Sequence, residues 1–303
     1  MPSSPSVHIL VLNWNGLRHL QACLPSLVNT TYDNCHFAVL DNASTDGSQA
    51  WVWEHFPQVQ LTEFPRNLGF TGANNVGMRA AMDAGADYLA LLNNDTRVEP
   101  DWMKALVAAA EAEADIAICA AQQHTWDGER EIRFHLIPEW AEAEAVYAPI
   151  EHAGAPVPTA FASGCAVLLR CDALRSLGLF DDRYFAYVED VDLTLRAWIA
   201  GYSALLVPEA VVYHRFSASS DSTRKTFWGY RNQLTTLLKL YQPETLCAFA
   251  QPILRRWFLT RNRTALRATL AALAMLPETL ARRARIQRTR QCADAEFLRL
   301  CER

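Results

Sequence analysis

Short apolar runs alternate with helix-like stretches through the first third of the chain. The run at 88–92 is too short for a helix and lacks polar alternation, so it predicts a strand buried on both faces of a largely parallel sheet. Three further strands are predicted at 7–12, 37–40 and 59–64, and helices at 17–28, 48–56, 76–84 and 102–114. This alternation predicts an α/β fold with a doubly wound, mostly parallel central sheet flanked by helices.

The pattern becomes less regular after residue 115. Strands are predicted at 116–122, 161–170, 204–207 and 211–213, and helices at 171–178, 188–200 and 227–240. Residues 124–158 are polar, irregular and rich in Glu, and they give no clear order. From 246 onward we expect two or three helices rich in Ala, Leu and Arg. The predicted division is therefore a main domain at 1–240 and a basic helical region at 241–303.

Charge is distributed unevenly along the chain. The formal net charge is −5, yet the segment from Lys239 onward has 13 Lys and Arg against 5 Asp and Glu. The preceding part has 15 basic against 28 acidic residues. An acidic body with a basic tail argues against a general nucleic-acid binder, and it suits a catalytic body whose tail meets an anionic surface or a partner.

Cysteine usage and the N-terminus indicate the compartment. The eight cysteines form no Cys-x-x-Cys pair, so we expect reduced thiols and neither a zinc site nor a disulfide framework. The N-terminal residues show no basic segment followed by a long apolar one, and no apolar run is long enough to span a bilayer. We therefore expect a cytoplasmic protein.

A polar residue follows each of the first four predicted strands: Asn13, Asp41, Asn67 and Asp95. The carboxyl ends of parallel strands meet at one edge of a sheet, where such folds bind their ligands. A carboxylate such as Asp95, after two asparagines, can hold a divalent cation that in turn holds a diphosphate. Asp41 can accept hydrogen bonds from a nucleobase or ribose. The alternative for both is simple turn chemistry.

Two motifs of nucleotide-binding proteins are missing from the sequence. No Gly-x-Gly-x-x-Gly follows the first predicted strand, and no phosphate-binding Gly-Lys-Ser/Thr loop occurs anywhere. These absences argue against an NAD-dependent enzyme and against an NTPase.

Three acidic residues, Glu189, Asp190 and Asp192, lie at the start of the predicted helix 188–200. The helix dipole favours negative charge there, so helix capping is one interpretation. Three carboxylates exceed what a cap requires, however, and aromatic residues precede them. Partial desolvation by such neighbours raises the pKa of a carboxyl group, as a general base needs.

His214 directly follows a short predicted strand, in a polar segment. A histidine in this position can bind a metal ion or a phosphate, although a lone histidine more often does neither.

Taken together, the sequence resembles glycosyltransferase family 2 with the GT-A fold, and most closely its bacterial rhamnosyltransferase-like branch. The resemblance covers about the first 240 residues. It rests on eight segments in order: VLNWNG at 11–16, LDNASTDGS at 40–48, RNLGFTGANNVG at 66–77, LLNNDT at 91–96, ASGCAVLLR at 162–170, GLFDDRYFAYVEDVDLTLR at 178–196, YHRFSASS at 213–220 and YRNQLTTLLKL at 230–240.

The resemblance implies a hexosyltransferase that moves a sugar, with inversion, from a nucleotide-diphosphate donor to an acceptor hydroxyl. The implied donor-binding residues are Asn13, Asn15 and Asp41 around the nucleoside, Asn67, Gly69 and Asn74 closing over the nucleotide, and Asn94. Asp95 would hold Mg²⁺ or Mn²⁺ with help from His214. Asp190 would be the catalytic base, with Glu189, Asp192 and Arg231 in supporting roles at the acceptor.

One departure from the family pattern concerns the metal. Asn93 stands where the common Asp-x-Asp motif has its first aspartate, as is usual in this branch. With fewer protein carboxylates, the metal ion should depend more on the diphosphate and on water.

The resemblance also implies the partners. dTDP-rhamnose is the favoured donor and a UDP-sugar the next, and the acceptor is a cell-surface polysaccharide or lipid-linked glycan. The basic C-terminal helices could contact the inner face of the membrane, pack on the main domain or form a homodimer. We expect no nucleic-acid partner.

Two other functions stay open. A sugar nucleotidyltransferase would have a similar sheet, but the chain lacks a Gly-rich loop bearing Lys or Arg after the first strand. A non-catalytic nucleotide-sugar binder would not require both Asp95 and Asp190.

Overall fold

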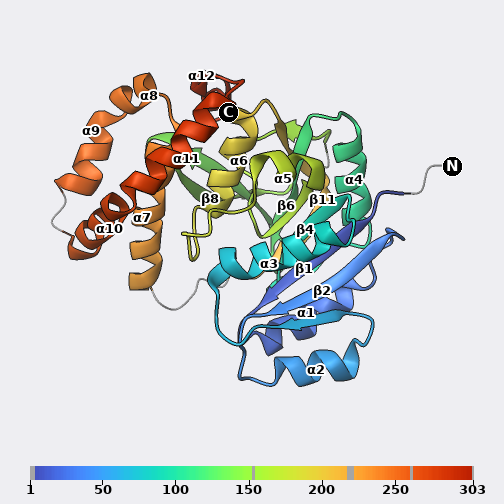
Figure 1. Ribbon diagram of the computed structural model, residues 1–303. Helices are drawn as coiled ribbons and strands as arrows, with labels where there is room; N and C mark the ends of the chain where they lie inside the picture. The colour runs from blue at the N-terminus through green and yellow to red at the C-terminus, as the bar shows by residue number, and fades with distance from the viewer. Residues whose placement is uncertain (1–3, 152–153, 217–221, 260–261, 302–303) are drawn as a thin grey trace.

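The structure is a computed structural model that describes residues 4–151, 154–216, 222–259 and 262–301. Strands and helices alternate through its first part (Figure 1). These elements are β1 (Val7–Asn13), α1 (Leu17–Leu27), β2 (Cys35–Asp41), α2 (Ser48–His55), β3 (Gln60–Glu63), α3 (Gly69–Asp83), β4 (Tyr88–Asn93), β5 (Thr96–Val98) and α4 (Trp102–Glu111).

The second part adds strands to the same sheet and ends in helices. Its strands are β6 (Ile116–Thr125), β7 (Arg130–Ile137), β8 (Glu142–Pro149), β9 (Val157–Pro158), β10 (Ala166–Arg170) and β11 (Ser203–His214). Its helices are the 3₁₀ turn η1 (Pro138–Trp140), α5 (Cys171–Leu177), α6 (Glu189–Ile199), α7 (Ser222–Leu240), α8 (Pro243–Ala248), α9 (Ala250–Ile253), the π-helix η2 (Leu254–Phe258), α10 (Arg263–Ala274), α11 (Leu276–Arg288) and α12 (Asp294–Leu298).

The sheet is mostly parallel at its N-terminal side and mixed beyond it. Its strand order is β3-β2-β1-β4-β10-β6-β11-β5. Strands β1 to β4 run parallel, and Asn13 pairs in register with Asp41, so the ends of β1 and β2 meet at one edge. Strand β10 is antiparallel to both β4 and β6. The predicted α/β fold with a mostly parallel central sheet is confirmed.

The centre of the sheet is closed to solvent because β4 is covered on both faces. Residues 88–92 each expose 2% or less of their surface. Trp102 of α4 and Leu20 of α1 pack on one face, whereas Met78 of α3 and Leu193 of α6 pack on the other. This double coverage explains why the 88–92 run has no polar alternation.

Several expectations from the sequence differ from the structure. The strand predicted at 161–170 begins only at Ala166, and the region after 246, where two or three helices were expected, is divided into a larger number of shorter ones. Helix α3 begins at Gly69, seven residues before the predicted start at 76, because contacts with other segments hold its polar first turns. The segment 124–158, which gave no clear order, contains the antiparallel hairpin β7–β8. The two strands predicted at 204–207 and 211–213 are one strand, β11, with an irregularity between Val207 and Val211.

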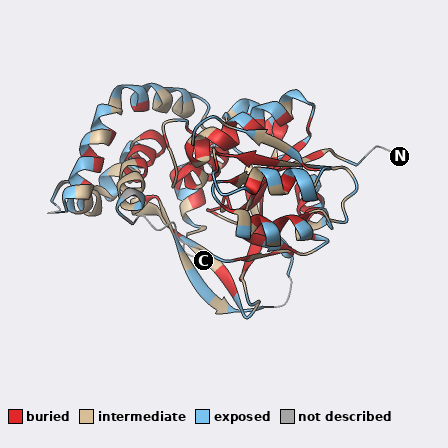
Figure 2. Ribbon diagram, turned by 90° about the horizontal axis from the view of Figure 1, so that it is seen from below, coloured by how far each residue is buried: buried red, intermediate tan, exposed pale blue. Residues whose placement is uncertain are grey.

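The C-terminal helices pack against α6 and α7. Leu195 of α6 and Leu237 of α7 share a buried cluster with Trp257 of η2 and Phe297 of α12. In Figure 1 these helices form the end of the molecule remote from β1–β3, and Figure 2 shows some buried positions among their mostly exposed ones. The division at residue 240 stays a prediction. The hydrophobic packing continues across that position.

No helix in the described part of the chain combines the length and apolar character needed to cross a bilayer.

Candidate active site

The ends of β1 and β2 form a network of buried polar side chains. Asn13 donates from Nδ2 to Asp41 Oδ1 at 3.0 Å, and Asp41 Oδ2 accepts from the backbone of Ser44 at 2.9 Å and from Gln49 at 2.9 Å. Asn94 in turn donates to Asn13 Oδ1 at 2.8 Å. The carboxylate of Asp41 therefore fixes the loops after β1 and β2, because its acceptors are used by several donors at once.

Asn15 lies at the exposed side of this network. Its backbone N–H donates to the Ser44 hydroxyl at 2.8 Å, and its side chain accepts from the Thr45 backbone at 2.7 Å. The preceding Trp14 is 58% exposed at the same edge. Trp14 was not predicted as a site residue. It could have been found from the sequence, because it is a large aromatic residue between two asparagines at a strand end that was predicted to meet a nucleoside.

The loop before α3 is also built from carboxamide contacts. Asn67 accepts from Asn42 Nδ2 at 3.0 Å and from the Gly69 backbone at 2.8 Å. Gly69 has a left-handed backbone, with φ of 76°. Asn74, in contrast, is buried inside α3 and donates to the Phe70 carbonyl at 3.0 Å. The structure thus places Asn67 and Gly69 at the sheet edge, whereas the Asn74 side chain binds its own helix.

Asp95 and His214 form the candidate metal-binding pair. The Oδ1 atom of Asp95, just after β4, lies 3.2 Å from Nε2 of His214 at the end of β11. The other ring nitrogen of His214 is 3.0 Å from Gln123 Oε1. Burial lowers the pKa of His214, but the Cys165 sulfur and the Asp95 carboxylate outweigh burial and raise the pKa to about 10. An imidazolium therefore faces the carboxylate.

The segment YHRFSASS extends past His214 beyond what the structure describes. Its residues 217–220 lie outside the described residues.

Asp190 and Glu189 begin α6 and line a cavity of about 650 Å³ that His214 and Asn93 also line. Asp190 is half-buried and accepts from the Gly164 backbone at 3.1 Å and from the Val191 backbone at 2.9 Å. Burial raises its pKa. Glu189 is 6% exposed, and burial followed by the charge of Asp190 raises its pKa well above the usual range.

The strands bring the two aspartates together. The Asn93 backbone donates to the Cys165 carbonyl at 2.8 Å, and the neighbouring Gly164 is the residue that binds Asp190. Asp190 thus lines the same cavity as Asn93 and His214, and Asp95 is connected to that cavity through its contact with His214.

A strained turn aims the acidic pair into the cavity. Tyr187 and Val188 both have φ of 72°, a left-handed conformation that costs energy for a β-branched residue such as Val188. Asn232 of α7 holds this turn by donating from Nδ2 to the carbonyls of Ala186 at 3.0 Å and Tyr187 at 2.8 Å. Asn232 was not predicted as a site residue. The only signal in the sequence was its position next to Arg231 in the segment YRNQLTTLLKL.

Arg231 contributes to the same support and does not line the cavity. It donates to the Arg183 carbonyl at 2.9 Å and to the Asn232 side chain at 2.9 Å. Its contacts therefore hold the segment that leads to Asp190.

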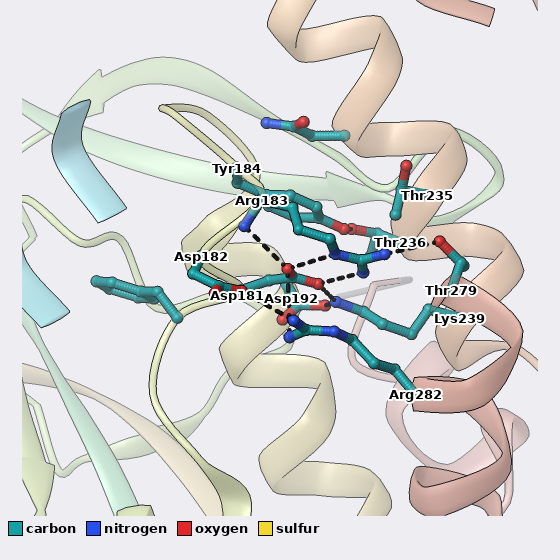
Figure 3. Close-up of polar contacts among 12 residues, drawn as sticks. Asp181, Asp182, Arg183, Tyr184, Asp192, Thr235, Thr236, Lys239, Thr279 and Arg282 are labelled. Atoms are coloured by element: carbon teal, nitrogen blue, oxygen red, sulfur yellow. Dashed lines mark hydrogen bonds and ion pairs between the residues drawn. The ribbon is translucent and has the colours of Figure 1, made fainter. Parts of the chain in front are cut away.

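Asp192 lies outside this cavity, in a buried ion cluster behind α6 (Figure 3). Its carboxylate is 2.8 Å from Arg196 and 2.6 Å from Lys239, and Lys239 also reaches Asp181 at 2.6 Å. Asp192 and Lys239 expose 2% of their side chains or less. The acids at the start of α6 thus separate into a cavity pair and a buried ion-pair member, because successive helical positions point in different directions.

Comparison with known proteins assigns the class. Residues 6–178, more than half of the chain, match the family described as Glycosyl transferase family 2, so the chain belongs to this family and is a glycosyltransferase. The predicted family membership is confirmed.

Particular relatives add detail. The N-acetylglucosaminyl-diphospho-decaprenol L-rhamnosyltransferase of Mycobacterium tuberculosis is 30% identical over 235 residues, which cover 70% of this chain and 76% of that protein. Among solved structures, GalNAc-T7 with UDP, GalNAc and Mn²⁺ has a TM-score of 0.67 at 14% identity, covering 99% of this chain and 57% of that one. The mannosyltransferase PcManGT of Pyrobaculum calidifontis, in complex with GDP-Man and Mn²⁺, has a TM-score of 0.58 at 16% identity, covering 92% and 76%. These likenesses confirm the GT-A fold.

Proposed function

We propose that this glycosyltransferase moves a sugar, with rhamnose favoured, from a nucleotide-diphosphate donor to a hydroxyl of a lipid-linked or polysaccharide acceptor of the bacterial envelope, with inversion. The M. tuberculosis relative, whose name gives both rhamnose transfer and a polyprenyl-diphosphate sugar, supports this choice. The observation that carries the proposal is the shared cavity: His214, paired with Asp95, and the acidic pair at the start of α6 face the same space.

The donor diphosphate is proposed to lie at Asp95 and His214 through Mg²⁺ or Mn²⁺. The pair fits such an ion chemically, because a carboxylate oxygen and an imidazole nitrogen already face each other at 3.2 Å. Loss of the proton between them would leave two atoms that can both bind a metal ion. The described residues hold no group of three or more such side chains, so diphosphate and water would complete the coordination. A bound cation would neutralise the charge that develops on the leaving diphosphate.

The nucleoside is proposed to lie along the edge formed by the loops after β1 and β2. Asn13 and Asp41 are buried and hold these loops in place. Trp14 and Asn15 are exposed and form the accessible surface. An exposed tryptophan at this position offers an aromatic face on which a base can stack.

Asp190 is proposed to accept the proton of the acceptor hydroxyl. Backbone N–H groups fix both of its oxygens, so the carboxylate is oriented before the acceptor arrives. Its raised pKa makes it a stronger base than an exposed aspartate. The acceptor side of the cavity is lined by aromatic residues that suit a sugar ring, namely Phe134, Phe161, Tyr187 and Tyr230.

Replacement of Asp190 by Asn tests the proposal. Asn keeps the size and hydrogen-bonding shape but cannot accept the proton, so the transfer rate should fall by about 10²–10⁴-fold. The assay offers dTDP-rhamnose, UDP-sugars and GDP-sugars with a polyprenyl-diphosphate acceptor, with and without Mn²⁺. Nucleotide affinity, measured by calorimetry, should stay unchanged.

Asp182→Asn is the matched control, because Asp182 has a 71% exposed side chain and lies outside the cavity. It should retain full activity. Unchanged transfer by Asp190→Asn would remove the base assignment. Release of pyrophosphate from an NTP and a sugar phosphate would instead indicate a nucleotidyltransferase.

A further inference from the structure

Helix α10 places its small residues inward and its large apolar residues outward. Ala265, Ala268 and Ala272 are at most 2% exposed. On another side of the same helix, Leu266 is 50%, Leu270 59% and Leu273 38% exposed. These three leucines follow i, i+4, i+7 spacing and form one stripe, here named the leucine ridge. Packing within this chain would by itself favour the opposite arrangement, with leucine inside.

The segment around the ridge is strongly basic. Between Glu244 and Glu278 the sequence contains no Asp or Glu, and it contains Arg255, Arg256, Arg261, Arg263 and Arg267. Arg256 is paired with Glu142 at 2.6 Å. Arg255, Arg263 and Arg267 are exposed, and none of these three forms an ion pair with any residue that the structure describes. Their charge is therefore available to an anionic partner.

The ridge is connected to one wall of the cavity. The Thr269 hydroxyl of α10 donates to the Trp257 carbonyl of η2 at 3.1 Å, and the neighbouring Arg256 lines the cavity of Asp190. Figure 1 shows α10 at the extreme end of the molecule, away from β1–β3, and Figure 2 shows exposed positions along these helices. The ridge therefore lies at the end of the molecule that is remote from β1–β3.

We propose that the leucine ridge, together with Arg255, Arg263 and Arg267, docks this chain on an anionic lipid leaflet. Leucine side chains enter the boundary between headgroups and acyl chains, while guanidinium groups bind lipid phosphates beside them. A symmetric dimer through this face would place two sets of arginines in one interface, and the segment between Glu244 and Glu278 has no acidic residue to balance them. This docking surface contains none of the residues that are proposed to take part in sugar transfer. Its role in presenting a lipid-linked acceptor rests on the proposed function.

Vesicle co-sedimentation of the full chain, without donor or acceptor, tests the docking surface. The vesicles contain phosphatidylcholine alone or phosphatidylcholine with about 30% phosphatidylglycerol, which gives their surface a negative potential. The wild type should bind the anionic vesicles far more tightly, and salt should weaken the binding because exposed charges are screened. Absence of binding to anionic vesicles would overturn the proposal.

Two sets of variants separate the apolar and the charged contributions. Replacing Leu266, Leu270 and Leu273 together by Gln should weaken vesicle binding at least about tenfold, since three leucines that would enter the lipid are lost. Each Arg→Gln change at 255, 263 or 267 should weaken binding about fivefold. Gln is a good helix former, so α10 should persist, as circular dichroism can verify.

Matched controls come from the opposite end of the molecule. Trp53→Gln removes a 70% exposed apolar side chain from α2, and Arg79→Gln removes an exposed arginine from α3. Both should bind vesicles like the wild type. Ridge variants that bind normally, or that only convert a dimer into a monomer in light scattering, would overturn the proposal. Transfer to a water-soluble acceptor is measured separately, so loss of activity and loss of docking remain distinguishable.

Discussion

At the scale of single residues, Glu189 is held in an unfavourable environment for a charge. It is 6% exposed beside Asp190, and its Oε2 atom has no hydrogen-bond partner among the described residues. Burial, and then the Asp190 charge, raise its pKa well above that of an exposed glutamate. Such a group lowers the stability of the fold at neutral pH, because folding must either bury the charge or bind a proton.

Glu189→Gln should therefore stabilise the protein at neutral pH. The pKa of Glu189 is raised in the folded state. Below about pH 4 the residue is protonated in both the folded and the unfolded state, so it does not lower the free energy of unfolding, whereas stability is lost as pH rises above that value. The gain in free energy of unfolding should be on the order of 1 kcal/mol at pH 8 and should shrink toward pH 4. Urea unfolding at several pH values measures it. Glu54→Gln, at an exposed position of α2, should change nothing, and a pH-independent effect would contradict the explanation.

Some site residues could be predicted from the sequence, and others could not. Asp95, Asp190 and His214 could be singled out because each follows a strand or begins a helix, and the family resemblance was needed to choose among their possible roles. Asp192 could not be separated from Asp190 on the sequence alone. Its position two residues further along α6 turns it toward Lys239, a partner that only the tertiary structure brings near.

At the scale of elements, α7 supports the turn that carries the acidic pair. Asn232 binds two carbonyls of a turn whose residues have left-handed backbones, and the stacked rings of Phe185 and Trp228, 4.5 Å apart, add a second contact between this segment and α7. The turn is strained and persists because α7 holds it from outside.

Asn232→Ala should lower the transfer rate without loss of nucleotide affinity. Removal of both hydrogen bonds frees the turn to relax, and the base then leaves its productive position, so kcat should fall about 10–100-fold. Steady-state kinetics and calorimetry measure the two quantities. Thr235→Ala is the matched control on the same helix, since the Thr235 hydroxyl binds the Arg231 carbonyl of its own helix at 2.8 Å. Equal kcat values for both variants would show that the turn needs no support.

Elements with a strong local pattern were predicted from the sequence, and those built by tertiary contacts were not. Strands β1 and β4 and helices α1 and α4 match their predicted positions closely. The first turns of α3 contain glycines and asparagines, which disfavour helices locally. They become helical because Asn75 binds the Phe180 backbone through both of its side-chain atoms, at 3.0 and 3.1 Å. The β7–β8 hairpin was not predicted because no residue of β8 is fully buried and its apolar positions are mostly alanine, which gives a weak strand signal.

At the scale of the whole molecule, a buried ion cluster joins helix α6 to the C-terminal helices. Lys239 of α7 lies between Asp181 and Asp192, and Arg282 of α11 reaches Asp181 at 3.4 Å. Burial opposes the charge on Asp181, but Arg183 and Lys239 outweigh burial and hold its pKa well below the usual range. Because that pKa is lowered, the stabilisation is complete above about pH 4 and is lost as pH falls.

Lys239→Met should destabilise the whole chain by about 3–5 kcal/mol at pH 7, because it leaves Asp192 and Asp181 buried with fewer partners. The difference from the wild type should shrink at low pH, where the carboxylates gain protons. Urea unfolding followed by fluorescence and circular dichroism measures it. Lys104→Met removes an exposed lysine paired with Asp101 at 3.2 Å and should cost less than about 1 kcal/mol. Similar losses for the two variants would show that burial of the cluster adds nothing.

The start of α3 touches the segment that leads to Asp190, and this contact constrains how the two halves of the molecule can move. The backbone N–H of Phe70 donates to the Phe185 carbonyl at 2.7 Å, and a side chain at residue 69 would collide with that carbonyl oxygen. The start of α3 and the segment that leads to Asp190 are thus joined at one point. A displacement of the loop before α3 must carry that segment with it or break the hydrogen bond. Under the proposed function, a shift at the donor side would therefore be transmitted to the proposed base.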